Sequence, residues 1–303
     1  MIVTVIGAGG FVGQRVVRHL VAREDVAEVR AVDRANLEHL SGVQCFKGDF
    51  SDPSVRHAAV KGADGVIHLA AVLGGSAEAD PGLARRVNVD ATLDLIEELR
   101  GSDTRFVFAS TIAAFGKPLP DPVTDDTPLA PSMLYGAQKV MIEVALSNFA
   151  RRGWLDAVSL RPSGVMARDG ADAALKSAFM SRLFYSVGRG EDITLPVAED
   201  SRTWLASVDN VARNFVHAVM MPDLGENRAL TLPALCLSYG ELVAALFRRF
   251  PDSRSTVRYQ PEAEVVGLFG QAPRLVTQTA DALGFSRDLN ADALVRDAME
   301  DIR

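Results

Sequence analysis

The chain has 303 residues, of which 48% are hydrophobic, enough to bury one large core or one core and a smaller lobe. Its net charge of −7 argues against a nucleic acid or an anionic membrane as partner. Cys45 and Cys236 form no CxxC or Cys/His cluster, which excludes a disulfide scaffold and a cysteine-based zinc site, and no metal is expected.

The chain begins with a strand-like run, MIVTVIGAGG, which lacks the basic segment and cleavage site of a signal peptide. No apolar stretch approaches the length of a membrane span. We therefore expect a cytoplasmic protein in a reducing compartment.

The first half of the chain alternates short β-branched runs with helical patterns. The strands are predicted at 2–6, 29–33, 43–49, 64–71, 105–110 and 156–161, and the helices at 11–23, 81–100 and 132–151. This alternation is typical of βαβ units with right-handed crossovers. The expected fold class is therefore α/β, with a doubly wound parallel sheet.

After about residue 165 the alternation loosens. Helices are predicted at 173–187, 208–220, 238–250 and 290–301, and short strands at 193–196 and 228–233. We expect residues 1–165 to form the first domain, with some later segments (about 203–232) returning to it. Residues 166–303 would then form mainly a smaller α/β lobe that binds the substrate.

The first predicted strand runs into GAGGFVG, which places Gly7, Gly10 and Gly13 before a helix. Glycine lets a pyrophosphate approach the backbone closely, and the helix N-terminus supplies N–H donors. Asp33 ends the next strand 20 residues after Gly13. A carboxylate there can accept hydrogen bonds from ribose hydroxyls and repel a 2′-phosphate. The pattern predicts a Rossmann-type domain that binds NAD rather than NADP, a preference that Arg34 weakens.

Tyr135 and Lys139 stand four residues apart in LYGAQK, so they share one face of the predicted helix. Ser110 and Thr111 end the strand before that helix, at the rim where parallel sheets bind ligands. A free tyrosine has a pKa of about 10, and a lysine cation beside it favours the phenolate. The pattern predicts that Tyr135 takes a proton from an alcohol that Thr111 orients, while the cofactor takes the hydride.

Three other strand ends reach the same rim. GDF would place Asp49 and Phe50 beside an adenine, and HLAA offers small residues for a close approach to a dinucleotide. LRPSGV completes the set. His68 stands between Ile67 and Leu69, which favours a core histidine over an acid or base.

These segments together resemble the extended short-chain dehydrogenase/reductase superfamily, of the nucleotide-sugar epimerase/dehydratase type. GAGGFVG, GDF, HLAA, VNVDAT, ASTIAAFG, YGAQK, LRP and SVDNVA follow the family's order over essentially the whole chain. The resemblance implies NAD as cofactor and a catalytic triad of Thr111, Tyr135 and Lys139. The cofactor positions that it implies are Gly7, Gly10, Phe11, Val12, Gly13, Asp33, Asp49, Phe50, Leu69, Ala70, Ala71, Asn88, Ser110, Tyr135, Lys139, Pro162 and Val165.

The residues after Thr111 bear on the reaction. Sugar-nucleotide dehydratases of this superfamily carry acidic residues there, whereas this chain has Ile112 and Ala113, so dehydrogenation and epimerisation remain. AVLGGSAEAD, TDDTPLAPSMLYGAQK and DSRTWLASVDNVA are most similar to the D-erythronate dehydrogenase group, which oxidises a four-carbon sugar acid at C2 with NAD.

That similarity implies a small sugar acid as substrate. Its carboxylate would bind Arg202 bidentately. Ser76, on the loop after the fourth strand, and Arg168 are further candidate contacts, together with Thr111. Alternatively, Arg202 forms a salt bridge between lobes, Ser76 caps a loop and Arg168 is a surface charge.

Two other functions stay open: a nucleotide-sugar epimerase with the same triad and tightly bound NAD, and a non-catalytic NAD-binding regulator. The triad disfavours the regulator, because a sensor needs no Tyr135 and Lys139. The resemblance also implies a homodimer, in which the helices around 81–100 and 132–151 would pair as a four-helix bundle.

Overall fold

The structure, a computed structural model, describes residues 1–37, 40–168 and 177–300. The chain divides into two compact units. The first comprises Met1–Lys117, Pro128–Arg161 and Ala212–Thr231, and the second comprises Pro118–Thr127, Pro162–Val211 and Leu232–Arg303. Among the described residues, no helix is long and apolar enough to cross a membrane.

The first unit is built on a seven-stranded parallel sheet with the order β10-β6-β5-β4-β1-β2-β3. Its strands are β1 (Ile2–Ile6), β2 (Glu28–Asp33), β3 (Gln44–Lys47), β4 (Gly65–His68), β5 (Arg105–Ala109), β6 (Asp156–Arg161) and β10 (Ala229–Thr231). The chain runs outward from β1 to β3 and then returns to β4 on the other side of β1. At such a switch point, ligands bind beyond the carboxyl ends of the strands.

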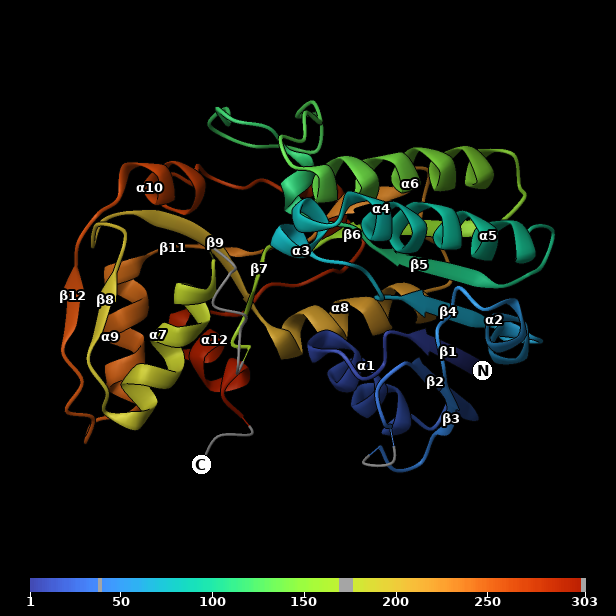
Figure 1. Ribbon diagram of the computed structural model, residues 1–303, viewed down its shortest axis with the longest axis horizontal. Coiled ribbons are helices and arrows are strands. Elements are labelled where there is room, and N and C mark those ends of the chain that lie inside the picture. Colours follow the sequence, from blue (N-terminus) through green and yellow to red (C-terminus); the bar gives the residue numbers. More distant parts are fainter. Residues whose placement is uncertain (38–39, 169–176, 301–303) are drawn as a thin grey trace. The chain divides into compact units, whose positions relative to one another are not determined.

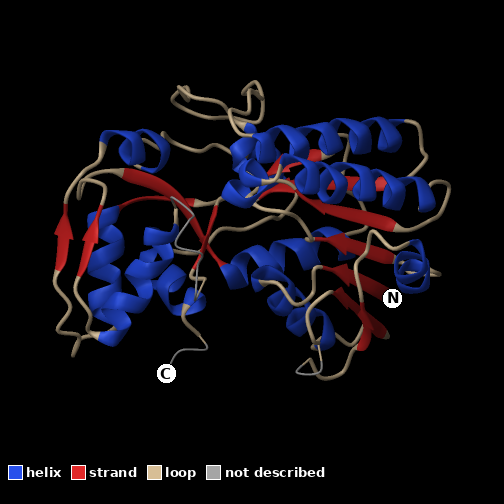
Figure 2. Ribbon diagram, in the orientation of Figure 1, coloured by secondary structure: helices blue, strands red, loops and turns tan. Residues whose placement is uncertain are grey.

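Helices cover both faces of this sheet (Figures 1 and 2). α5 (Ala91–Glu98) and α6 (Leu134–Arg151) lie on one face, and α1 (Phe11–Val21) and α8 (Val208–Met220) on the other (Figure 1). Leu95 of α5 and Leu146 of α6 are fully buried in a core that also contains Phe106. The prediction of a Rossmann-type doubly wound parallel sheet is confirmed.

Three local features of the first unit differ from the sequence-based expectation. The helix predicted at 81–100 consists of α4 (Pro81–Arg85), a π-helical turn η1 (Arg86–Asp90) and α5, because apolar spacing does not reveal a widened turn. Ser76 was expected on a loop, and this was wrong, since it lies in the short helix α3 (Gly74–Ala79). α2 (Pro53–Val60) was not predicted, although Asp52 caps it through the N–H of Ser54 at 2.8 Å.

The second unit is a smaller α/β assembly. β9 (Arg202–Ser207) pairs with β7 (Gly164–Met166) in parallel and with β11 (Leu235–Ser238) antiparallel. β8 (Ile193–Leu195) pairs with β12 (Val257–Tyr259), and the helices are α7 (Ala178–Arg189), α9 (Tyr239–Arg249), α10 (Ala263–Phe269), α11 (Gln278–Ala282) and α12 (Ala291–Ala298). α7, α9 and α12 share one core. The first residues of the helix predicted at 173–187, and residue 301 of that predicted at 290–301, lie outside the described residues.

Candidate active site

The glycine turn after β1 lies directly against the chain that follows β4. Gly7 has a φ of +88°, and a Cβ there would stand 2.7 Å from the backbone nitrogen of Ala70. The carbonyl of Ile6 accepts hydrogen bonds from Leu69 at 2.8 Å and from Ala70 at 3.1 Å. A Cβ on Gly13 would stand 2.1 Å from the carbonyl oxygen of Gly7. The turn can take this form only with glycine, and the N-cap Gly10 of α1 makes no side-chain cap hydrogen bond.

Asp33 is held at the end of β2 by the turn itself. Its carboxylate accepts hydrogen bonds from Gly9 and from Ala35, each at 2.9 Å. A Cβ on Gly9 would lie 3.1 Å from this carboxyl group, so Gly9 belongs to the turn although the motif did not single it out. Phe50 is 5% exposed, and its side chain packs in the core. Its side chain is therefore part of the core, and its role beside an adenine stays a prediction.

Asn88, in the π-helical turn η1, ties two predicted cofactor segments together. It is 2% exposed, and its amide group bonds both the N–H of Val72 at 2.8 Å and the carbonyl of Val72 at 2.9 Å. It also donates to Gln138 of α6 at 2.8 Å. Asn88 therefore holds the segment after Ala71 next to the helix that carries Lys139.

Ser110 and Thr111 follow β5. Thr111 caps the short 3₁₀ helix η2 (Ile112–Ala114) by accepting a hydrogen bond from Ala113 at 3.1 Å. Ser110 is 3% exposed, and its hydroxyl has no hydrogen-bond partner among the described residues. An unpaired buried hydroxyl is costly, so this atom is suited to bond a bound cofactor.

Tyr135 and Lys139 stand at the start of α6. The ammonium nitrogen of Lys139 lies 4.5 Å from the ring centre of Phe108 and 5.7 Å from that of Tyr135. Lys139 is 2% exposed, and this burial lowers its pKa to about 7, against the opposing effect of Glu143. Next to Tyr135, Gly136 packs against Ala113 of η2. The structure thus brings the phenol, the ammonium and the turn after Thr111 to one place in the first unit.

His68 is a core histidine. It is fully buried among Phe50, Phe106 and Phe108, and its Nε2 lies 3.1 Å from the hydroxyl of Thr92. Burial and, to a lesser extent, the charge of Lys139 lower the pKa of His68 to about 3. The imidazole is therefore neutral at physiological pH and unsuited to act as an acid.

This depressed pKa predicts a loss of stability in acid. Between pH 6.5 and about 3 the unfolded chain binds a proton at His68 that the folded chain does not. The free energy of unfolding should therefore fall, by up to about 1.4 kcal/mol per pH unit, as the pH drops through this range. His68→Leu should show a shallower decline in urea denaturation at pH 7, 6, 5 and 4. An unchanged decline would contradict the assignment.

Four predicted site residues belong to the second unit: Pro162, Val165, Arg168 and Arg202. Arg202 is half-exposed, donates to the carbonyl of Cys236 at 2.7 Å and lies 3.7 Å from the carboxylate of Glu241. The backbone N–H of Arg168 bonds Ser181 at 3.1 Å. The roles of these four residues toward cofactor or substrate, like that of Ser76, stay predictions.

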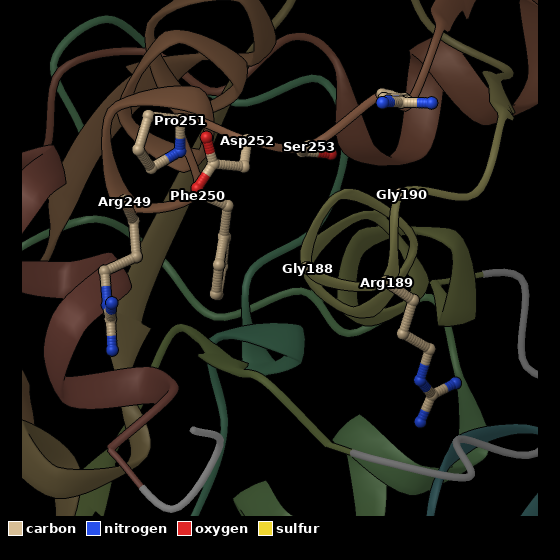
Figure 3. A pocket seen from close by; sticks show the side chains of 9 residues that line it. Gly188, Arg189, Gly190, Arg249, Phe250, Pro251, Asp252 and Ser253 are labelled. Atoms are coloured by element: carbon tan, nitrogen blue, oxygen red, sulfur yellow. The ribbon is translucent and has the colours of Figure 1, made fainter.

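The second unit also has a surface pocket of about 470 Å³, at the C-terminal ends of α7 and α9 (Figure 3). Arg189 and Arg249 lie on opposite sides of Phe250 and do not converge. A cation near a helix C-terminus interacts favourably with the helix dipole, and this accounts for both arginines without a ligand. No predicted site residue lines this pocket, and the described part of the chain contains no His, Cys, Asp and Glu group that could hold a metal ion.

Comparisons with known proteins agree with this geometry. The NAD dependent epimerase/dehydratase family matches residues 3–231. A D-erythronate dehydrogenase from Cupriavidus necator is 34% identical, over 99% of this chain and 98% of that protein. One from Haemophilus influenzae is 28% identical over 99% of both chains.

Solved structures show the same fold. A nucleoside-diphosphate-sugar epimerase from Agrobacterium tumefaciens superposes with a TM-score of 0.88 at 29% identity, over 100% of this chain and 94% of that chain. A holo L-threonine dehydrogenase from Cupriavidus necator superposes with a TM-score of 0.88 over the whole of both chains, at 20% identity. The chain therefore belongs to the NAD-dependent epimerase/dehydratase family, as an NAD-dependent oxidoreductase of the extended short-chain dehydrogenase/reductase type.

Proposed function

We propose that the chain oxidises a secondary alcohol of a small sugar acid, D-erythronate or a close relative, at C2. The observation that carries this proposal is the extent of the similarity. The two D-erythronate dehydrogenases align with 99% of the chain, and thus with both units. A UDP-glucose 4-epimerase from Streptomyces lividans aligns with 75% of the chain at 28% identity.

The residues of the first unit divide the chemistry between them. The glycine turn and the start of α1 would bind the pyrophosphate, and Asp33 the adenosine ribose. NAD, when bound, supplies the hydride acceptor. Thr111 would orient the substrate hydroxyl and Tyr135 would take its proton, while the cation of Lys139 favours the phenolate.

In the second unit, Arg202 would hold the substrate carboxylate. Its guanidinium is half-exposed and anchored by the carbonyl of Cys236. A planar guanidinium matches a carboxylate through two parallel hydrogen bonds. Ser76 in α3 and Arg168 after β7 are the further candidate contacts.

A panel of sugar acids tests this function. The chain, supplied with NAD and with erythronate, threonate and related acids of either configuration at C2, should generate the absorbance band of NADH with at least one of them. Absence of NADH with every acid, together with NAD retained through purification, would count against a dehydrogenase.

The second candidate is a nucleotide-sugar epimerase. It is favoured by the similarity to the nucleoside-diphosphate-sugar epimerase from Agrobacterium tumefaciens, which superposes with the whole of this chain. Such an enzyme would release no NADH, and UDP- or dTDP-sugars would raise its melting temperature. The two panels run in parallel separate the candidates.

We also propose a homodimer formed through α5 and α6, which run side by side in Figure 1. Leu93 of α5 is 37% exposed, and Met141 and Val144 of α6 are 56% and 63% exposed. Exposed apolar side chains on neighbouring helices are typical of a surface that another chain covers. A second copy is the occupant expected, since the same patch on two copies can pair about a two-fold axis.

An arginine placed in this face should separate the copies. Val144→Arg should change the mass measured by light scattering from that of a dimer to that of a monomer, because a charge would be buried in an apolar interface. Val21→Arg is the matched control, since Val21 is 41% exposed on α1. A monomeric parent protein, or a dimeric Val144→Arg variant, would refute the proposed interface.

A further inference from the structure

A buried ion pair stands one helical turn beyond Lys139. Glu143 of α6 accepts three hydrogen bonds from the guanidinium of Arg161, at 2.9, 3.1 and 2.6 Å. The side chains are only 2% and 7% exposed. Both oxygens of the carboxylate are thus engaged by an arginine at the end of β6.

Such a pair is not explained by stability alone. Removing two charges from water costs about as much as their attraction returns, so buried pairs can often be replaced by neutral side chains without loss. The position of the pair offers another reason for it. Lys139 and Glu143 are separated by one turn on the same face of α6, where a lysine and a glutamate ordinarily attract each other.

Among the described residues, the ammonium of Lys139 contacts aromatic rings, not the carboxylate of Glu143. It lies over the rings of Phe108 and Tyr135, at 4.5 and 5.7 Å from their centres. The charge of Glu143 nevertheless reaches Lys139, because it raises the pKa that burial lowers. His68 of β4, whose pKa the charge of Lys139 lowers, is neutral near pH 7. Glu78 of α3, which faces the start of α6, bonds the N–H of Leu134.

We propose that Arg161 and Glu143 are positioning residues for Lys139. Arg161 holds the carboxylate of Glu143 by two-point bonding, so that the carboxylate supports the charge of Lys139 from a distance without drawing the ammonium away from Tyr135. The inference rests on the proposed function, in which Lys139 tunes Tyr135. Neither residue touches the reacting atoms in this arrangement.

The ionisation of Lys139 can be measured without turnover. The chain contains five lysines, so an NMR spectrum of the protein with ¹³Cε-labelled lysine has few signals. The signal that is missing from the spectrum of Lys139→Arg belongs to Lys139. In the full-length, NAD-free protein its titration midpoint should lie near 7. Glu143→Gln should lower the midpoint by about one pH unit or more, because it removes the anion that supports the ammonium. Arg161→Met should raise it by a similar amount and lower kcat, because the released carboxylate draws Lys139 away.

Arg161→Lys serves as the conservative variant, and it should return both the midpoint and kcat toward those of the parent protein. A single variant that leaves one buried charge unpaired can fail to fold. The double variant Glu143→Gln/Arg161→Met leaves no unpaired charge, so it tests the inference if a single variant does not fold. Its midpoint should fall below that of the parent, since the charge of Glu143 raises the pKa of Lys139.

Unchanged midpoints in folded variants would overturn the inference, because a purely structural pair has no effect on the titration of Lys139. Failure of the proposed function gives a different result. If Tyr135→Phe kept full turnover, the catalytic role would be lost, whereas the shifts in the Lys139 midpoint would still be observed. The two hypotheses are therefore tested separately.

Discussion

Tyr135→Phe should lower kcat by about 10²- to 10⁴-fold, the range that a positioned acid or base contributes. The substitution removes one hydroxyl and keeps the ring that lies beside the ammonium of Lys139. It leaves the glycine turn and Asp33 untouched, so the affinity for NAD should be largely intact. The measurements are the initial rate of NADH formation with the best sugar acid and the titration of NAD by calorimetry.

Tyr259→Phe is the matched control for this experiment. Tyr259 lies in β12 of the second unit, and its substitution also removes a single phenol hydroxyl. Its kcat should equal that of the parent protein. If Tyr135→Phe turned over as fast as Tyr259→Phe, the assignment of Tyr135 as the base would be wrong, and another group would have to take the proton.

The cofactor side of the site was predictable because its signals are local. Gly7, Gly10 and Gly13 stand in one short run, and Asp33 marks the end of the next strand. The alternation of strands and helices predicted a parallel sheet, and the structure adds the strand order, in which the chain returns to β4 beside β1. Tyr135 and Lys139 needed only the period of a helix to be placed on one face.

Other features depend on neighbours that lie far away in the sequence. Arg161 and Glu143 are 18 residues apart and on different elements, so no periodic pattern joins them. The hint in the sequence was the spacing of Glu143 from Lys139, one turn along the same face. Likewise, Gly9 shows its importance only through Asp33, 24 residues on.

Helices that lack a strong local signal were also missed or misplaced. α3 begins with two glycines and has no side-chain cap, so nothing in its sequence set Ser76 apart from a loop. α2 does have a local signal, an aspartate followed by proline, which is a recognisable helix start, and the helix was nevertheless not predicted. The π-helical turn that carries Asn88 was predicted as helix but not as a π-helical turn, since its apolar positions fit an ordinary helix.

Gly136 controls how closely the helix of Tyr135 approaches the turn of Thr111. A Cβ at this position would stand 2.3 Å from the carbonyl oxygen of Ala113 and 3.1 Å from Pro131. Ala113 belongs to η2, which Thr111 caps. Because the obstructing atoms include backbone, they cannot rotate away as the end of a long side chain could. The start of α6 and η2 must therefore separate when any side chain is added.

Gly136→Ala should for this reason lower kcat by about 10²-fold, the cost of a displacement of about 1 Å between catalytic groups. Overpacking should cost about 1–3 kcal/mol in the free energy of unfolding, partly offset by the better helix propensity of alanine. The affinity for NAD should change little, since the glycine turn lies after β1. Gly267→Ala is the control, a helical glycine of α10 with no atom within 4 Å of an added Cβ. Stopped-flow rates and urea denaturation of both variants test the prediction, and a Gly136→Ala variant with the kcat of the parent would show that Tyr135 and Thr111 need no such close approach.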